Sequence, residues 1–210
     1  MSDKTFPEQA TTLAATHDIS PALAFGLGEG LNLYYRRQLV QAPPHLIHVL
    51  PLAFGEKLAE RLILPRPQAI ADALASNAYG VMVCTGDWHG LDAIEKWGEE
   101  LPFWQNTQGW EQSIIAAATL IEQTDGLYRR AYCHFLNEAL PYYNEVAAPR
   151  ALLNEIADEW LAIATRLRTD DNFERIGSRV LRMASRESRF WGMILDRFGL
   201  GREREVSTSH

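Results

Sequence analysis

The sequence has no excess of positive charge and no long apolar run, and each shortage excludes a class of protein. Its 20 Lys and Arg residues are outnumbered by 27 Asp and Glu residues, which gives a net charge of −7. We therefore expect no nucleic-acid partner, because contact with a phosphate backbone needs a basic face. No stretch approaches the roughly 18 consecutive apolar residues of a membrane span, so we expect no membrane association.

Cysteine is also scarce, which bears on the expected location. Thiols occur only at Cys84 and Cys133. The first residues, Met1–Glu8, lack the apolar core of a signal peptide. Two cysteines without an export signal favour free thiols in a reducing compartment over a disulfide framework. We expect a cytoplasmic protein.

What the chain does contain is typical of a globular helical protein. Hydrophobic residues make up 47% of the 210 residues and charged residues 22%, which suffices for a sizeable core. From Ala53 onward, apolar residues recur every three or four positions, as at Ile70, Leu74, Ala78 and Val81. The periodicity predicts a mainly α fold, a multi-helix bundle with a loop-rich N-terminal third that has room for one or two short strands.

Proline and glycine divide this helical pattern into segments. Pro65 and Pro67 separate a loop-rich part from the continuous helical pattern. The predicted division is therefore an N-terminal glycine-containing region at 1–64, a helical bundle domain at 65–200 and a flexible tail at 201–210. Near the other end of the bundle, Asp171 is the predicted N-terminal cap of the last helix.

Two N-terminal segments keep alternative interpretations. Residues 31–40 fit the alternation of a strand and also one face of a helix. Residues 45–50 form a short apolar run bounded by prolines, which suits a strand or an extended connector.

Three glycines within five residues, Gly26, Gly28 and Gly30, are the most distinctive local feature. A glycine-rich loop can cradle phosphate at a helix N-terminus. This spacing matches neither the dinucleotide fingerprint nor the phosphate loop, and Glu29 would repel a phosphate. We predict a tight turn with close backbone packing.

Candidate catalytic residues are confined to one short stretch. Cys84, Asp87 and His89 place a thiol, a carboxylate and an imidazole within six residues, the groups that an activated cysteine nucleophile requires. One short turn rarely aims three side chains at a single point. The structural alternative is a buried cysteine, a helix-capping aspartate and a loop histidine.

A second group of candidates lies on one helix. Arg129 and Arg130, with Tyr128 and Tyr132, form a basic and aromatic patch suited to a carboxylate or a phosphate such as phosphopantetheine. Internal ion pairs with the many glutamates are the structural alternative.

Metal-binding patterns are sparse, and we predict no metal and no cofactor. His45 and His48 suit a metal only on a helix and with further ligands. His134 and Glu138 share a helix face, where a surface hydrogen-bonded pair is the favoured interpretation. The Glu-x-x-His pairs of di-iron bundles do not occur.

Three runs resemble one known family. The run LAFGLGEGLNLYY at 23–35 resembles the butirosin-biosynthesis protein H N-terminal family, and GLYRRAYCHFLNEA at 126–139 resembles the helical domain that often follows it. The run GLDAIE at 90–95 is similar to that second domain. The resemblance implies a papain-like plan, in which an N-terminal cysteine with a downstream histidine and acid moves acyl groups from carrier proteins onto amines in natural-product pathways.

The chain departs from this family at the catalytic residues. The family's cysteine would fall near Asp3–Phe6, but no cysteine precedes Cys84. The stretch that should form the β-sheet with its histidine and acid is missing. The resemblance therefore assigns no catalytic position here and indicates a shortened relative.

These observations favour one function and leave two alternatives. The favoured function is an auxiliary, non-catalytic helical protein of bacterial specialised-metabolite or modified-peptide biosynthesis, with an acyl-carrier protein or a peptide of the same pathway as its partner. The first alternative is a thiol-dependent acyltransferase that forms amide bonds from a carrier-bound acyl group, using Cys84 or Cys133. The second is a helical-bundle oxygenase or ligand carrier.

Overall fold

The computed structural model describes residues 6–31, 49–83 and 90–199, and all regular structure within these ranges is helical. The elements are α1 (Phe6–His17), α2 (Pro21–Leu27), α4 (Val49–Leu62), α5 (Arg66–Val83), α6 (Gly90–Glu100), η1 (Leu101–Asn106), α7 (Trp110–Gln123), α8 (Arg129–Ala139), η2 (Asn144–Val146), α9 (Ala147–Thr169) and α10 (Phe173–Phe198), where η marks a 3₁₀ helix. The predicted mainly α fold is confirmed.

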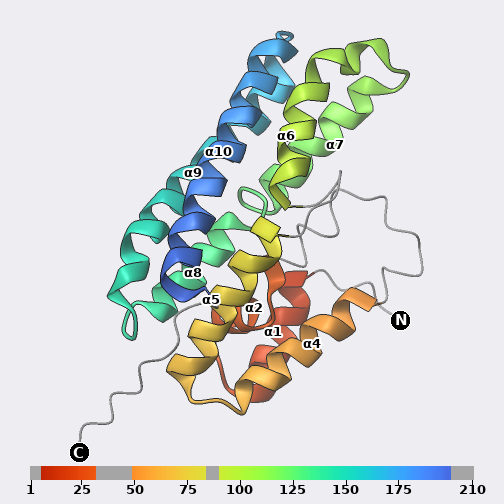
Figure 1. Ribbon diagram of the computed structural model, residues 1–210. Coiled ribbons are helices and arrows are strands. Elements are labelled where there is room, and N and C mark those ends of the chain that lie inside the picture. The colour runs from red at the N-terminus through yellow and green to blue at the C-terminus, as the bar shows by residue number, and fades with distance from the viewer. Residues whose placement is uncertain (1–5, 32–48, 84–89, 200–210) are drawn as a thin grey trace, which may run out of the picture.

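The long helices α9 and α10 lie side by side and extend along most of the molecule (Figure 1). Helix α10 also packs on α5 and α6, and α9 packs on α7 and α8. Figure 1 shows α6 and α7 together at one end and α1, α2 and α4 gathered at the other. The core is continuous from Ala14 of α1 to Ile194 of α10.

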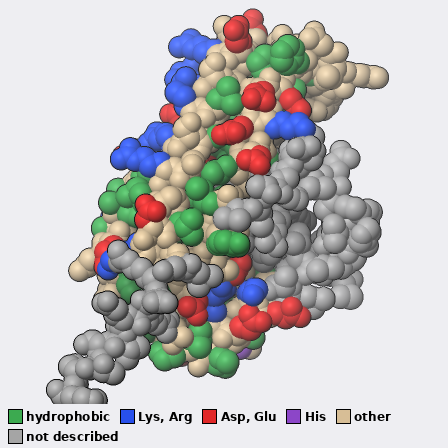
Figure 2. All heavy atoms as spheres, in the orientation of Figure 1, with side chains coloured by type: hydrophobic (Ala, Val, Ile, Leu, Met, Phe, Trp, Pro, Cys, Tyr) green, Lys and Arg blue, Asp and Glu red, His purple; other side chains and the backbone are tan. Residues whose placement is uncertain are grey.

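Helix α10 shows how the sequence produces this packing. Its buried positions recur at helical spacing, so one stripe faces the core while the arginines face outward. The stripe consists of Phe173, Ile176, Gly177, Val180, Met183, Ala184, Glu187, Phe190, Trp191 and Ile194. Figure 2 shows basic and acidic side chains interspersed over the face that holds α9 and α10.

The predicted cap of α10 is wrong by one position. The side chain of Asn172, not Asp171, accepts a hydrogen bond from the backbone N–H of Arg175 at 2.9 Å. Aspartate and asparagine cap equally well, so the sequence alone did not separate two adjacent candidates.

The segment 45–50 is also corrected in part. Val49 and Leu50 form the start of α4 and are not strand. Pro51 stands in the first turn of this helix, where a missing N–H is tolerated. Residues 45–48, with His45 and His48, lie outside the described residues, as do 32–40, where a strand remained an alternative.

The N-terminal helices share the core of the bundle. Helix α2 packs on α8 and α5, and α4 packs on α5. The division into 1–64 and 65–200 stays a prediction, and the tail at 201–210 lies outside the described ranges. Among the described helices, none is both long enough and apolar enough to cross a membrane.

Candidate functional site

A charged pair lies at the centre of the bundle, between α8 and α10. Arg129 Nε and Nη2 donate to the two carboxylate oxygens of Glu187 at 3.0 and 2.7 Å. Trp160 Nε1 donates to Glu187 Oε1 at 2.7 Å. The side chains of Arg129 and Glu187 are 1% and 0% exposed. Arg129 therefore pairs internally with a glutamate, which is the structural alternative given for it above.

The environment of Glu187 acts on its charge in two opposing ways. Burial raises the pKa of Glu187 well above its usual value. The hydrogen bonds from Arg129 and Trp160 stabilise the carboxylate form and oppose that rise. A charge held this tightly inside a core is a structural group, because neither partner reaches a ligand at the surface.

A strained turn leads into this pair. Asp125, Gly126, Leu127 and Tyr128 all have positive φ angles, of 46°, 73°, 57° and 64°. Each non-glycine residue in this left-handed conformation costs about 1–2 kcal/mol. The remaining nitrogen of the Arg129 guanidinium, Nη1, donates to the carbonyl of Leu127 at 2.7 Å and so holds the turn.

Gly126 is required by this turn for a second reason. A Cβ at this position would lie 2.8 Å from the carbonyl oxygen of Ala157 on α9. The turn therefore lies directly against α9. The left-handed geometry of this turn was not predicted from the sequence.

The other predicted ligand-binding residues point in different directions. Arg130 Nη2 donates to Asp158 of α9 at 2.5 Å, and this hydrogen bond raises the pKa of Arg130. The Tyr128 ring packs on Phe25 of α2, with centroids 6.0 Å apart. Tyr132 is completely buried. The four residues thus do not form one surface patch.

The thiols fall into two cases. Cys84, Asp87 and His89 lie outside the described residues, and their catalytic role stays a prediction. Cys133 is 4% exposed, and its Sγ lies 3.9 Å from the carbonyl oxygen of Arg150. Burial raises the pKa of Cys133 to about 12, so at neutral pH it is a thiol and not the thiolate that acts as a nucleophile.

The glycine run forms a close packing surface. A Cβ on Gly26 would lie 2.1 Å from the Phe135 ring, one on Gly28 would lie 2.5 Å from Phe54, and one on Gly30 would lie 2.4 Å from Phe25. The backbone at the end of α2 and directly after it thus passes as close to aromatic rings as only glycine permits. The predicted close backbone packing is confirmed, but the turn is confined to Gly28 and Glu29, because Gly26 still belongs to α2.

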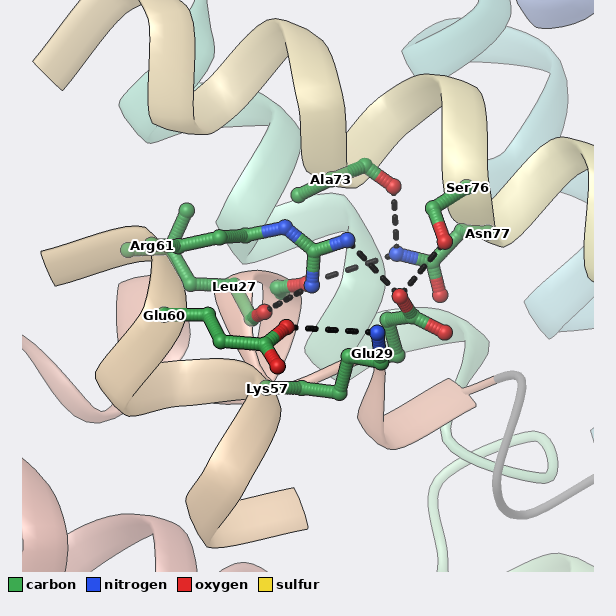
Figure 3. Close-up of polar contacts among 9 residues, drawn as sticks. Leu27, Glu29, Lys57, Glu60, Arg61, Ala73, Ser76 and Asn77 are labelled. Carbon is green, nitrogen blue, oxygen red and sulfur yellow. Dashed lines mark hydrogen bonds and ion pairs between the residues drawn. The ribbon is translucent and has the colours of Figure 1, made fainter. Parts of the chain in front are cut away.

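A second buried ion pair fixes this turn (Figure 3). Glu29 has a φ of 58°, and its Oε1 accepts from Arg61 Nη2 at 2.7 Å and from Ser76 Oγ at 2.5 Å. Arg61 Nη1 also donates to the carbonyl of Leu27. This cluster was not predicted from the sequence. Its signal was a single carboxylate within an apolar glycine run, since a buried carboxylate requires a cation.

Two buried polar atoms in the described part of the chain have no hydrogen-bond partner, Asn77 Oδ1 and Tyr132 Oη. The Asn77 amide donates to the carbonyl oxygens of Gly26 and Ala73, so only its oxygen is unpaired. Burial and then the nearby charge of Glu29 raise the pKa of Tyr132. Tyr132 therefore lies within electrostatic reach of the second ion pair.

A groove of about 470 Å³ opens between α1, α2 and α8. Its apolar wall is made by α2 with part of α8, and its polar edge by the exposed side of α8. His134 and Glu138, one helical turn apart, are both exposed along this edge. The lining residues are Thr11, Ser20, Pro21, Ala22, Phe25, Ala131, His134, Asn137 and Glu138.

Within the described ranges, no three His, Cys, Asp or Glu side chains are grouped so that they could hold a metal ion.

Comparison with known proteins identifies one family. No curated protein and no solved structure matches the chain. The model of a domain of unknown function, DUF4872, matches residues 56–194. This range runs from within α4 to Ile194 of α10 and includes Arg61 and Arg129 of the two buried ion pairs, while α1 and α2 lie before it. Because the match spans well over half of the 210 residues, the chain belongs to the DUF4872 family.

Proposed function

We propose that the chain is an auxiliary, non-catalytic binding protein of bacterial specialised-metabolite or modified-peptide biosynthesis, which holds a partner protein in the groove between α1, α2 and α8. The observation that carries the proposal is the composition of that groove. One wall comes from α2, where Phe25 belongs to the run 23–35 that resembles the butirosin-biosynthesis family and Pro21 and Ala22 lie directly before that run. The other wall comes from α8, within the run 126–139 that resembles the family's helical domain, and Thr11 and Ser20 complete the lining.

The dimensions and chemistry of the groove suit a binding role. Its volume falls in the range of about 300–1,000 Å³ typical of ligand sites. Apolar surface for binding is provided by the buried Phe25 with Pro21, Ala22 and Ala131. The polar edge of α8 would fix the orientation of the bound segment. Such a groove holds a few side chains of a partner segment rather than an entire domain.

The charged and thiol side chains of the described core serve structural contacts. This supports a binding role over the acyltransferase alternative. Both buried arginines are committed to glutamates, and Cys133 is held as a thiol. Cys84 remains the nucleophile of that alternative. Replacing Cys84 with alanine and assaying acyl transfer from a loaded carrier protein tests it directly, since activity that disappears in C84A would favour the enzyme.

Co-expression with the proteins encoded beside this one tests the binding role. Ala131→Arg fills the groove from α8, and Ala22→Arg fills it from α2. Ala116→Arg, at an exposed position of α7, is the matched control. We expect one co-purified partner that is retained by wild type and A116R and lost from A131R and A22R. All variants should keep the wild-type circular dichroism spectrum. Failure to retain any neighbour, or equal retention by all four proteins, would contradict the proposal.

A further inference from the structure

Resting on the proposed function, we infer that the groove receives a basic side chain, lysine or arginine, from an apolar segment of the partner. The inference starts from the charges that face the groove. Among the described residues that line the groove, Glu138 is the only acidic one, and none is Lys or Arg. The polar residues that line the groove from α1 and from the cap of α2, Thr11 and Ser20, carry no charge. Besides Glu138, the one titratable residue of α8 that lines the groove is His134.

Glu138 has no cation of its own in the described part of the chain. Several exposed carboxylates on the bundle are paired with arginines, as Glu122 is with Arg168 and Glu155 with Arg186. Arg150, which contacts the groove edge, donates to Asn137 Oδ1 at 2.6 Å. Glu138 is therefore available to a cation from outside, and the net charge of −7 favours the approach of a basic partner.

The shape of the groove matches the two-part character of a long basic side chain. Lysine and arginine bury their aliphatic stems along apolar surface while the charged head stays at the water boundary. In the groove the stem would lie along Phe25 and Ala131, and the head would meet the Glu138 carboxylate at the rim. An acidic or uncharged side chain could occupy the apolar part but would gain nothing from Glu138.

A short peptide provides the probe. Acetyl-Ala-Leu-Lys-Leu-Ala-amide and two counterparts, with Gln or Glu in place of Lys, are titrated into the ¹⁵N-labelled full chain. Shifts in amide resonances report the site and the affinity. We expect the Lys peptide to shift the amides of α8 around His134 and Glu138. Because an exposed ion pair contributes little, we expect the Gln peptide to bind about three- to fivefold more weakly and the Glu peptide more weakly still.

The variants Glu138→Gln and Glu111→Gln make the test specific. Glu111 is an exposed glutamate of α7 and serves as the matched control. E138Q should bind the Lys and Gln peptides equally, and E111Q should behave as wild type. Equal affinity of wild type for all three peptides overturns the inference, as does the absence of shifts up to about 5 mM peptide.

The two proposals fail in different ways. If the co-purified partner is lost from A131R but kept at full strength by E138Q, the groove binds the partner without a basic side chain, and only this inference falls. If no partner is lost from A131R, the proposed function falls with it.

Discussion

The Phe135 ring of α8 lies across Gly26 of α2, so close that a Cβ on Gly26 would be 2.1 Å from the ring. This contact joins the N-terminal glycine run to the family-matched bundle, because Phe135 is fully buried and also packs on Tyr132, with ring centroids 5.2 Å apart. The glycine run is therefore part of the core packing and not a separate phosphate-binding loop.

Substitution of Gly26 tests this packing. We expect Gly26→Ala to lower the free energy of unfolding by about 1–3 kcal/mol, because the ring must move to admit a methyl group. Gly55→Ala is the matched control on α4, where a Cβ would meet nothing within 4 Å. There, the higher helix propensity of alanine should raise stability by up to about 1 kcal/mol. Urea unfolding measures both, and a G26A protein as stable as wild type would contradict the contact.

The pair Arg129–Glu187 leads to a prediction about buried charge. Arg129→Met leaves the Glu187 carboxylate buried without its cation, and we expect it to cost about 3–5 kcal/mol of stability. The double variant Arg129→Met with Glu187→Leu removes both charges and should be clearly more stable than R129M alone. A double-mutant cycle by urea unfolding gives the coupling. Additive effects of the two changes would show that the pair does not act as a unit.

An exposed pair provides the contrast for this cycle. Arg168 binds both oxygens of Glu122 at the surface, in a geometry similar to that of Arg129 and Glu187. Arg168→Met should change stability little, because water replaces the lost partner. A large loss of stability in both R129M and R168M would show that the cause is the lost packing of the arginine aliphatic chains. It would not be the unpaired charge of the buried Glu187.

The helices could be predicted from the sequence because their signals are local. Gly109 and Gly126, for example, stand close to the two ends of α7, where glycine signals a helix boundary. Apolar spacing of three and four residues likewise placed Ile70 and Leu74 of α5 in the core. Local signals failed where two capping residues are adjacent, at Asp171 and Asn172, and at Val49 and Leu50, which begin α4.

The ion pairs could not be predicted in the same way because they are not local. Arg129 and Glu187 are 58 residues apart, and Arg61 and Glu29 are 32 apart. Periodicity shows which face of a helix is buried but not which helix lies opposite. A charge on a buried face is a signal that a partner exists, and only the fold identifies it. The groove could not be predicted from the sequence for the same reason, because its walls come from three helices.

The unpaired hydroxyl of Tyr132 leads to a prediction of the opposite sign. Its Oη is buried without a hydrogen-bond partner, so Tyr132→Phe removes a desolvated polar group and leaves the ring contacts in place. We expect stability to be unchanged or raised by up to about 1 kcal/mol. Tyr143→Phe is the control, since the Tyr143 hydroxyl donates to the carbonyl of Pro67 at 2.8 Å and its loss should cost about 0.5–1.5 kcal/mol. A destabilised Y132F would show that the hydroxyl has a partner in solution, such as a bound water.

The accessibility of Cys133 gives a kinetic prediction that also separates the two functions. In a Cys84→Ala background, Cys133 is the only thiol of the chain. With its pKa raised to about 12, only about one molecule in 10⁴ carries the thiolate at pH 8. We therefore expect the folded protein to react with Ellman's reagent far more slowly than the same protein in denaturing urea. The native rate should follow the opening of α8, because reagent must first reach a side chain that is 4% exposed. Native labelling as fast as that of the unfolded chain would mean that this thiol is open and ionised, and the acyltransferase alternative would then regain Cys133 as its nucleophile.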